Sequence, residues 1–202
     1  MSARVPSAPP LVGIFVGGAA RRMGGVAKGL LPAPDGTGSL VDRTANFARG
    51  LGLEVVLVGE HPAYAALGLG VLADAETGQG PLGGLVALLA RAGTGRAIAL
   101  ACDLTFVERR LLSTLATAPI GAAVLAPRRD GIWAPLAARY DAARVLPIAR
   151  ERLGRRERSL QGLLDAVGAD ALSLTPQDER MLTDWDTPDD VADPTRDGRH
   201  DR

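Results

Sequence analysis

Short runs of apolar residues alternate along the chain with longer stretches in which apolar positions recur at helical spacing. The short runs predict buried strands, and the longer stretches predict amphipathic helices. We expect strands at residues 11–16, 54–58, 70–73, 97–101 and 122–126. We expect helices between them at residues 40–49, 63–67, 82–92 and 107–116. This alternation is typical of an α/β fold, in which helices cover both faces of a parallel sheet.

The order of elements changes after residue 126. A further strand is expected at 134–140, helices at 141–153 and 159–167, and a late strand at 171–174. Ser39 and Gly50 are the expected caps of helix 40–49. We interpret residues 1–10 as a flexible N-terminal tail, 11–193 as a single domain and 194–202 as a disordered tail. The basic start and short apolar stretch also fit a signal peptide, but we favour a buried first strand after a loose tail.

The composition limits the partners to be expected. Lysine plus arginine and aspartate plus glutamate both number 23 in 202 residues, so the formal net charge is zero and nucleic acid is not an expected partner. Cys102 is the only cysteine, which excludes an internal disulfide and suits the reducing cytoplasm. No apolar run approaches the ~20 residues needed to cross a bilayer, so no membrane partner is expected.

Three polar features follow predicted strands, at what would be a common edge of the sheet. They are a glycine-rich basic loop after the first strand, Asp74 after the third and Asp103 after the fourth. In an open parallel sheet, ligands bind beyond the carboxyl ends of the strands, where the strand order switches. The three features therefore predict one binding site.

The loop reads GGAARRMGGVAKGLL from residue 17 to residue 31. Its glycines let the backbone approach a ligand closely, with consecutive N–H groups directed at phosphate oxygens. Arg21, Arg22 and Lys28 add positive charge that would neutralise a triphosphate. The spacing matches neither a P-loop nor a dinucleotide-binding fingerprint, and a purely structural turn is the alternative.

Asp103 and Asp74 supply carboxylates with different expected tasks. Asp103 ends the run AIALACD, and Mg²⁺ bound to substrate phosphates usually takes one or two protein carboxylates. The alternative for Asp103 is a helix cap or a turn residue. Asp74 precedes a second glycine-rich turn, GQGPLGG, where a carboxylate would accept hydrogen bonds from the N–H groups of guanine. An Asx turn is the alternative for Asp74.

The segment FVGGAARRMGGVAKGLL resembles the nucleotide-binding signature of the molybdenum cofactor guanylyltransferases, a MobA-like nucleotidyltransferase family. The resemblance continues in the family's order through LAD before GPLGG, ACDLTFV, APLAARY, RSLQGLL and DWDTPDDV, and it covers residues 11–191. It implies a Rossmann-like three-layer α/β/α nucleotidyltransferase fold with a mostly parallel sheet. It also implies transfer of GMP from GTP to molybdopterin carrying molybdenum, with Mg²⁺ as the cofactor and diphosphate as the second product.

The same resemblance implies roles for the residues that match the family's motifs. Arg22 and Lys28 would contact phosphates and Asp103 would bind Mg²⁺, so these three are the catalytic candidates. Binding of the second substrate is expected at Arg158, Asp184 and Asp186, although a solvated helix face and turn is the alternative for the Arg158 segment. Nucleotide binding is expected at Phe15, Val16, Gly17, Gly18, Lys28, Asp74, Gly80 and Asp103. Molybdenum cofactor insertion proteins or molybdoenzyme chaperones are the expected protein partners.

The sequence departs from the family's pattern at several positions. Ala27 stands where the family has aspartate, Asp184 and Asp186 stand where it has asparagine, and residues 58–59 lack its asparagine. The missing carboxylate at Ala27 predicts a defect in positioning, and so in turnover rather than in GTP binding. Three alternatives stay open: a CTP-using cytidylyltransferase, a transferase with another phosphorylated acceptor, and a nucleotide-binding accessory protein without turnover.

Overall fold

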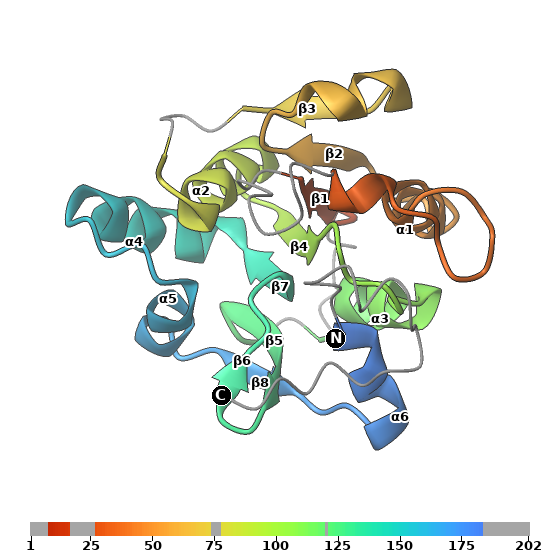
Figure 1. Cartoon of the computed structure of the whole chain (residues 1–202). Coiled ribbons are helices and arrows are strands. Elements are labelled where there is room, and N and C mark those ends of the chain that lie inside the picture. Colours follow the sequence, from red (N-terminus) through yellow and green to blue (C-terminus); the bar gives the residue numbers. More distant parts are fainter. Residues whose placement is uncertain (1–7, 17–26, 74–77, 120, 184–202) are drawn as a thin grey trace.

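The computed structural model describes residues 8–16, 27–73, 78–119 and 121–183 of the chain. The described strands form one sheet in the order β3-β2-β1-β4-β7-β5-β6, with β8 beside β5 (Figure 1). Their bounds are β1 Leu11–Phe15, β2 Val55–Val58, β3 Gly70–Leu72, β4 Arg96–Ala101, β5 Val124–Arg129, β6 Ile132–Trp133, β7 Ala137–Asp141 and β8 Asp170–Leu172. Predictions for Gly17, Gly18, Arg22, Asp74, Asp184, Asp186 and the tail 194–202 lie outside the described residues.

The sheet is mostly parallel in the half that contains β1. The strands β3, β2, β1 and β4 are parallel to one another, and β8 is parallel to β5. β7 is antiparallel to both β4 and β5. The apolar stretch at the start of the chain is thus β1, an internal strand of the sheet, as the preferred interpretation of that stretch predicts.

The hairpin between β5 and β6 was not expected from the sequence. Asp130 and Gly131 connect the paired residues Arg129 and Ile132, and both connecting residues have positive φ angles, 50° and 80°. Two residues of positive φ form a type I′ turn, for which Asp-Gly is a favoured pair. The signal was therefore present, but β6 has only two residues and gives no alternating pattern of its own.

Helices cover both faces of the sheet, which confirms the three-layer α/β/α architecture (Figure 1). α1 and α3 pack on one face, and α2, α4 and α5 on the other. Successive residues of β1 point to opposite faces: Ile14 joins the core under α1 and α3, whereas Phe15 joins the core under α2. The helices are α1 Leu40–Arg49, η3 Pro62–Leu67, α2 Pro81–Ala92, α3 Arg109–Thr117, α4 Ala142–Gly154, α5 Leu160–Ala166, α6 Pro176–Glu179, and the short turns η2 Lys28–Leu30 and η4 Arg180–Leu182.

The caps predicted for α1 are confirmed. Ser39 is the N-cap, and its Oγ accepts a hydrogen bond of 3.1 Å from the Asp42 N–H. The Asp42 carboxylate accepts in return from the Ser39 N–H at 3.3 Å, which completes a capping box. Gly50 is the C-cap. These local contacts fix where α1 begins and ends.

Other boundaries shift from their predicted positions. The short helix expected at 63–67 is a 3₁₀-helix that begins at Pro62. α3 begins at Arg109 rather than 107, because Glu108 has an extended backbone and is the N-cap. β5 continues to Arg129 because the hairpin extends it, and the late strand occupies 170–172 rather than 171–174. Among the described residues, no helix has both the length and the apolar character needed to cross a membrane.

Candidate active site

The carboxyl ends of β1 and β4 lie side by side where the strand order switches. From β1 the chain continues to β2 on one side, whereas β4 lies on the other side of β1. The two strands stay in register to their last residues, Phe15 and Ala101. Beyond them, the Cys102 N–H donates a hydrogen bond of 3.2 Å to the Phe15 carbonyl. The segments that follow β1 and β4 therefore start together at the edge where α/β sheets bind ligands.

Lys28 and Asp103 form an ion pair at this edge. Lys28 Nζ lies 3.3 Å from Asp103 Oδ2, although the two residues are 75 positions apart in the sequence. Their side chains are 17% and 21% exposed, so they are partly shielded from water and still open to a ligand. Lys28 begins η2, and Asp103 lies in the turn after β4. Two of the three predicted catalytic residues are thus in direct contact.

Asp103 does not cap the helix that follows it. α3 has Glu108 as its N-cap, five positions further along the chain. The side chain of Asp103 instead accepts the hydrogen bond from Lys28. Its main-chain carbonyl accepts a hydrogen bond of 3.2 Å from Thr105 Oγ1. Of the two alternatives to a ligand-binding role, the helix cap is therefore excluded, and a turn position remains.

Gly29, Tyr64 and Cys102 pack directly behind the ion pair. The Gly29 N–H donates a hydrogen bond of 3.0 Å to Tyr64 Oη. Tyr64 is 3% exposed, and burial raises the pKa of its hydroxyl far above the usual value. Burial, together with the nearby charge of Asp103, raises the pKa of the Cys102 thiol to about 12. Both groups are therefore neutral at physiological pH, and the charges in this contact are those of Lys28 and Asp103.

The carboxylate of Asp103 fits a divalent cation that arrives with a substrate. Within the described ranges, no group of three or more histidine, cysteine, aspartate or glutamate side chains could hold a metal ion by itself. Mg²⁺ keeps several waters and is usually held by one or two carboxylates together with substrate phosphates. One partly exposed carboxylate beside a lysine, at the ligand-binding edge, supplies the protein's share of such a site.

Three further nucleotide-binding candidates lie in described segments. The side chains of Phe15 and Val16 are buried in the cores on opposite faces of the sheet. A nucleotide at this edge would therefore meet their main chains rather than their side chains. Gly80 is the N-cap of α2 and has a φ of 67°, a conformation that favours glycine. α2 follows β3, so its N-terminus lies at the carboxyl edge of the sheet, where helix N–H groups favour phosphate.

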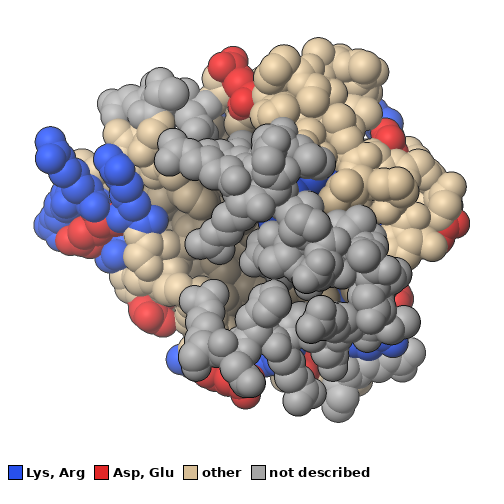
Figure 2. Space-filling model, viewed as in Figure 1, with Lys and Arg blue, Asp and Glu red and all other residues tan. Residues whose placement is uncertain are grey.

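Arg158 is exposed, in the connection between α4 and α5. Basic side chains gather over this region, at the left of Figure 2. Two of its arginines form ion pairs, Arg152 with Glu157 at 3.0 Å and Arg155 with Glu151 at 2.7 Å. Within the part of the chain that the structure describes, no hydrogen bond or ion pair joins Arg158 to Lys28 or Asp103. The assignment of Arg158 to the second substrate stays a prediction.

The protein is a three-layer α/β/α domain with a lysine and a carboxylate at the switch point of its sheet. This arrangement is typical of proteins that bind nucleotide phosphates. The sequence matches the family described as "MobA-like NTP transferase domain" over residues 12–169. The chain belongs to this family of nucleotidyltransferases, which confirms the family suggested by the sequence motifs. Enzymes of this kind generally use a divalent metal.

Relatives of similar length support the match. The chain is 32% identical over 196 residues to a protein of Pseudomonas putida named molybdenum cofactor guanylyltransferase, covering 94% of this chain and 100% of the relative. A protein of the same name from Pseudomonas entomophila is 31% identical, with 91% and 97% covered.

Solved structures confirm the fold class. Molybdopterin-guanine dinucleotide biosynthesis protein A from Archaeoglobus fulgidus superposes with a TM-score of 0.72 at 20% identity, covering 90% of this chain and 94% of that one. The 2-C-methyl-D-erythritol 4-phosphate cytidylyltransferase of Thermus thermophilus gives a TM-score of 0.62 at 16% identity, with 92% and 96% covered.

Proposed function

We propose that this protein transfers GMP from GTP to molybdopterin carrying molybdenum, forming the guanine dinucleotide cofactor and releasing diphosphate. The observation that carries the proposal is the Lys28–Asp103 pair at the switch point of a nucleotidyltransferase fold. The choice of substrates rests on relatives named molybdenum cofactor guanylyltransferase, which match almost the whole chain.

The reaction requires alignment and charge neutralisation rather than a protein nucleophile. The terminal phosphate oxygen of molybdopterin, already ionised at neutral pH, forms a bond to the α-phosphorus of GTP. The bond between that phosphorus and the bridging oxygen to the β-phosphate breaks, and the electron pair leaves with diphosphate. In-line attack of this kind depends mainly on positioning and on electrostatic stabilisation of the transition state.

Lys28 would neutralise part of the charge of the triphosphate directly, and Asp103 would do so through a bound Mg²⁺. The ammonium of Lys28 would exchange its contact with Asp103 for phosphate oxygens, which carry more negative charge. Asp103 would then hold Mg²⁺ against the same phosphates, and this cation would neutralise charge that develops on diphosphate. The neutral Tyr64 hydroxyl would keep η2 in place through the Gly29 N–H during this exchange.

The other proposed contacts complete the two substrate sites. Arg22 would add positive charge at the phosphates, and Asp74 would accept hydrogen bonds from guanine. Arg158, Asp184 and Asp186 would contact molybdopterin. The proposed location is the cytoplasm, with insertion proteins or molybdoenzyme chaperones as recipients of the product.

GTP with Mg²⁺ is expected to raise the Tm of the protein more than ATP, CTP or UTP does. A saturating ligand at about 100 times its Kd stabilises by about 2.7 kcal/mol, equivalent to roughly 5–10 °C for a chain of this size. The measurement is a thermal melt with each nucleotide, followed by a diphosphate-release assay with molybdenum-loaded molybdopterin. Release that needs both GTP and the acceptor supports the proposal.

The same pair of assays separates the alternatives. Equal shifts with all four nucleotides would remove the guanine assignment, and preference for CTP in both assays would identify a cytidylyltransferase. Diphosphate release with GTP and a different phosphorylated acceptor, but not with molybdopterin, would identify a transferase for that other acceptor. A shift with GTP but no product in a single-turnover assay would identify an accessory protein without turnover.

Restoring the family's carboxylate by Ala27→Asp is expected to raise kcat several-fold, with GTP affinity unchanged or slightly weaker. Ala27 is the N-cap of η2 and directly precedes Lys28, and its side chain makes no capping hydrogen bond. Aspartate is a favoured N-cap, so it would steady η2 and orient the Lys28 ammonium. Its negative charge beside Lys28 would at the same time weaken the attraction for phosphate.

Ala27→Asn is the matched control, because asparagine caps a helix about as well but carries no charge. A gain of rate with both variants would assign the effect to capping, and a gain with aspartate alone would assign it to the charge. If neither variant gains rate, the position does not limit turnover in this protein.

A further inference from the structure

Arg43 of α1 is a charged residue in an unusual place. It is 6% exposed, and burial lowers the pKa of its guanidinium. Its Nη1 lies 3.9 Å from Asp35 Oδ2, and within the described residues its buried Nε has no hydrogen-bond partner. A buried, incompletely paired guanidinium destabilises a fold relative to an apolar side chain. Stability of the fold alone therefore does not explain why an arginine occupies this position.

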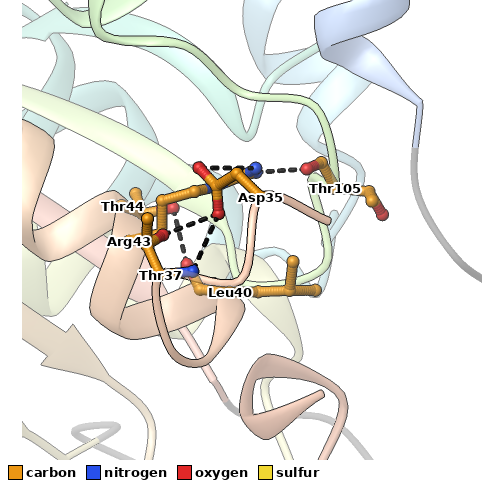
Figure 3. Close-up of polar contacts among 6 residues, drawn as sticks. All are labelled: Asp35, Thr37, Leu40, Arg43, Thr44 and Thr105. Atoms are coloured by element: carbon orange, nitrogen blue, oxygen red, sulfur yellow. Dashed lines mark hydrogen bonds and ion pairs between the residues drawn. The ribbon is translucent and has the colours of Figure 1, made fainter. Parts of the chain in front are cut away.

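The guanidinium of Arg43 is directed at the segment that carries Asp103. Arg43 Nη2 donates a hydrogen bond to the main-chain carbonyl of Thr105 (Figure 3). The opposite side of the guanidinium faces Asp35, and its Cζ lies over the ring of Phe47, 5.9 Å from the ring centroid. This contact joins helix α1 to a turn 62 residues further along the chain.

Thr105 transmits this contact to Asp103. It is completely buried, and its Oγ1 donates a hydrogen bond of 3.2 Å to the Asp103 carbonyl. Its N–H donates a hydrogen bond of 3.1 Å to the carbonyl of Thr183. All three hydrogen-bonding groups of Thr105 are therefore engaged, and each holds a different part of the molecule. Asp103 itself is two residues away, in a turn without regular secondary structure.

The loop before α1 fixes the orientation of Arg43. Both the N–H and the Oγ1 of Thr37 donate hydrogen bonds to Asp35 Oδ1, at 3.2 Å and 2.6 Å (Figure 3). These bonds lower the pKa of Asp35, so its carboxylate stays ionised, with Oδ2 toward Arg43. The exposed loop thus holds a negative charge beside the guanidinium, on the side away from Thr105.

We propose that Arg43 is a positioning residue for Asp103: from α1 it holds the Thr105 carbonyl, and Thr105 holds the Asp103 carbonyl, so that the carboxylate stays beside Lys28. This inference rests on the proposed function for its effect on rate. A planar guanidinium with several donors is better suited than a lysine to such a bridge, because it faces Asp35 and Thr105 at once. A carboxylate in a turn needs such support, since a displacement of about 1 Å at a reacting centre can lower the rate by about 100-fold.

Arg43→Met is the first test, because methionine has a similar length and no hydrogen-bond donor. We expect kcat to fall roughly 10- to 100-fold, and the Mg²⁺ concentration for half-maximal rate to rise. Arg43→Lys, which restores a charged donor group without the planar guanidinium, is expected to recover part of the rate. Arg109→Met is the matched control: Arg109 also donates a hydrogen bond to a main-chain carbonyl across the α1–α3 layer, that of Gly50 at 2.9 Å, but this carbonyl is at the C-cap of α1 and not in the segment that carries Asp103. It should keep the kcat and Mg²⁺ dependence of the unchanged protein.

A second readout needs neither substrate nor metal. The Cys102 N–H bonds to Phe15 and the Thr105 N–H bonds to Thr183, so the exchange of these two amide hydrogens reports whether the Asp103 segment is held. Both amide hydrogens should exchange at least about tenfold faster in Arg43→Met than in Arg109→Met. The two variants are compared at temperatures that lie the same number of degrees below their own Tm values. This arm tests the placement of Asp103 even if the unchanged protein proves inactive with GTP.

Thr105→Val keeps the proposal testable if Arg43→Met does not fold. Valine has nearly the shape of threonine and leaves both main-chain contacts, so it removes only the hydroxyl bond to Asp103. We expect kcat to fall several-fold with Thr105→Val and to stay near that of the unchanged protein with Thr105→Ser. Unchanged Mg²⁺ dependence and unchanged exchange of Cys102 and Thr105 in the Arg43 or Thr105 variants would overturn the proposal. Equal losses in Arg43→Met and Arg109→Met would also overturn it.

Discussion

Asp103→Asn is expected to lower kcat about 100-fold or more, the effect usual for loss of a main electrostatic stabiliser of a transition state. Asparagine keeps the shape of the side chain but removes the negative charge that would hold a divalent cation against the phosphates. GTP binding should be retained, because the substitution weakens the contact between Lys28 and Asp103 and leaves the Lys28 ammonium in place to contact phosphate. Steady-state kinetics with GTP and molybdenum-loaded molybdopterin, at several Mg²⁺ concentrations, checks the expectation.

The fold should survive the substitution. Asp103 lies in a partly exposed turn, and a pair of this kind contributes about 0–1 kcal/mol, equivalent to a fall in Tm of at most about 4 °C. Glu54→Gln is the matched control, because Glu54 forms an ion pair of 2.8 Å with Arg91 and directly precedes β2, at the opposite edge of the sheet. It should leave kcat unchanged. A kcat for Asp103→Asn within several-fold of the control would mean that Asp103 is only a turn residue and that the cation is held elsewhere.

Gly29→Ala is expected to lower the free energy of unfolding by about 1–3 kcal/mol, the usual result of adding a methyl group to a filled site. A Cβ atom at Gly29 would lie 2.5 Å from Val41 Cγ2, 3.0 Å from Tyr64 Oη and 3.1 Å from Cys102 Cβ. Val41 is a β-branched residue in α1 and cannot turn away easily. η2 would have to move outward and take Lys28 with it, so activity should fall together with stability.

Urea unfolding measures this loss, and two variants make the test specific. Val41→Ala in the Gly29→Ala background removes the methyl group in closest contact, so the double variant should lose less stability than the sum of the single changes. Gly154→Ala is the control, because a Cβ atom there meets no other atom within 4 Å. If Gly29→Ala unfolds like this control, the close packing behind Lys28 does not constrain η2.

The ends of α1 and the strands of the first half could be predicted from the sequence because their causes are local. Ser39 and Asp42 form their capping box within four residues, and each strand run is short, apolar and followed closely by glycine or a polar residue. The parallel direction of β3, β2, β1 and β4 follows from the alternation of strands and helices, since parallel neighbours need a crossover between them, whereas the order of these strands is known only from the structure. The shared edge of the β1 and β4 ends followed from this topology.

The second half was less predictable because its pairings join distant segments. β7 is antiparallel to β4, and β8 returns to lie beside β5, although the sequence signal for either strand contains no information about direction or partner. The hairpin at Asp130 and Gly131 was also not predicted, although its turn signal is local.

The sequence by itself determined the fold class, the family and the edge of the sheet at which the candidate residues gather, because periodicity, caps and motif order are properties of neighbouring residues. Only the tertiary structure decided which side chains meet there. The contacts of Lys28 with Asp103, of Gly29 with Tyr64 and of Arg43 with Thr105 join residues 75, 35 and 62 positions apart. Whether a lysine, tyrosine or arginine finds such a partner depends on how the layers pack, and no local pattern in the chain records it.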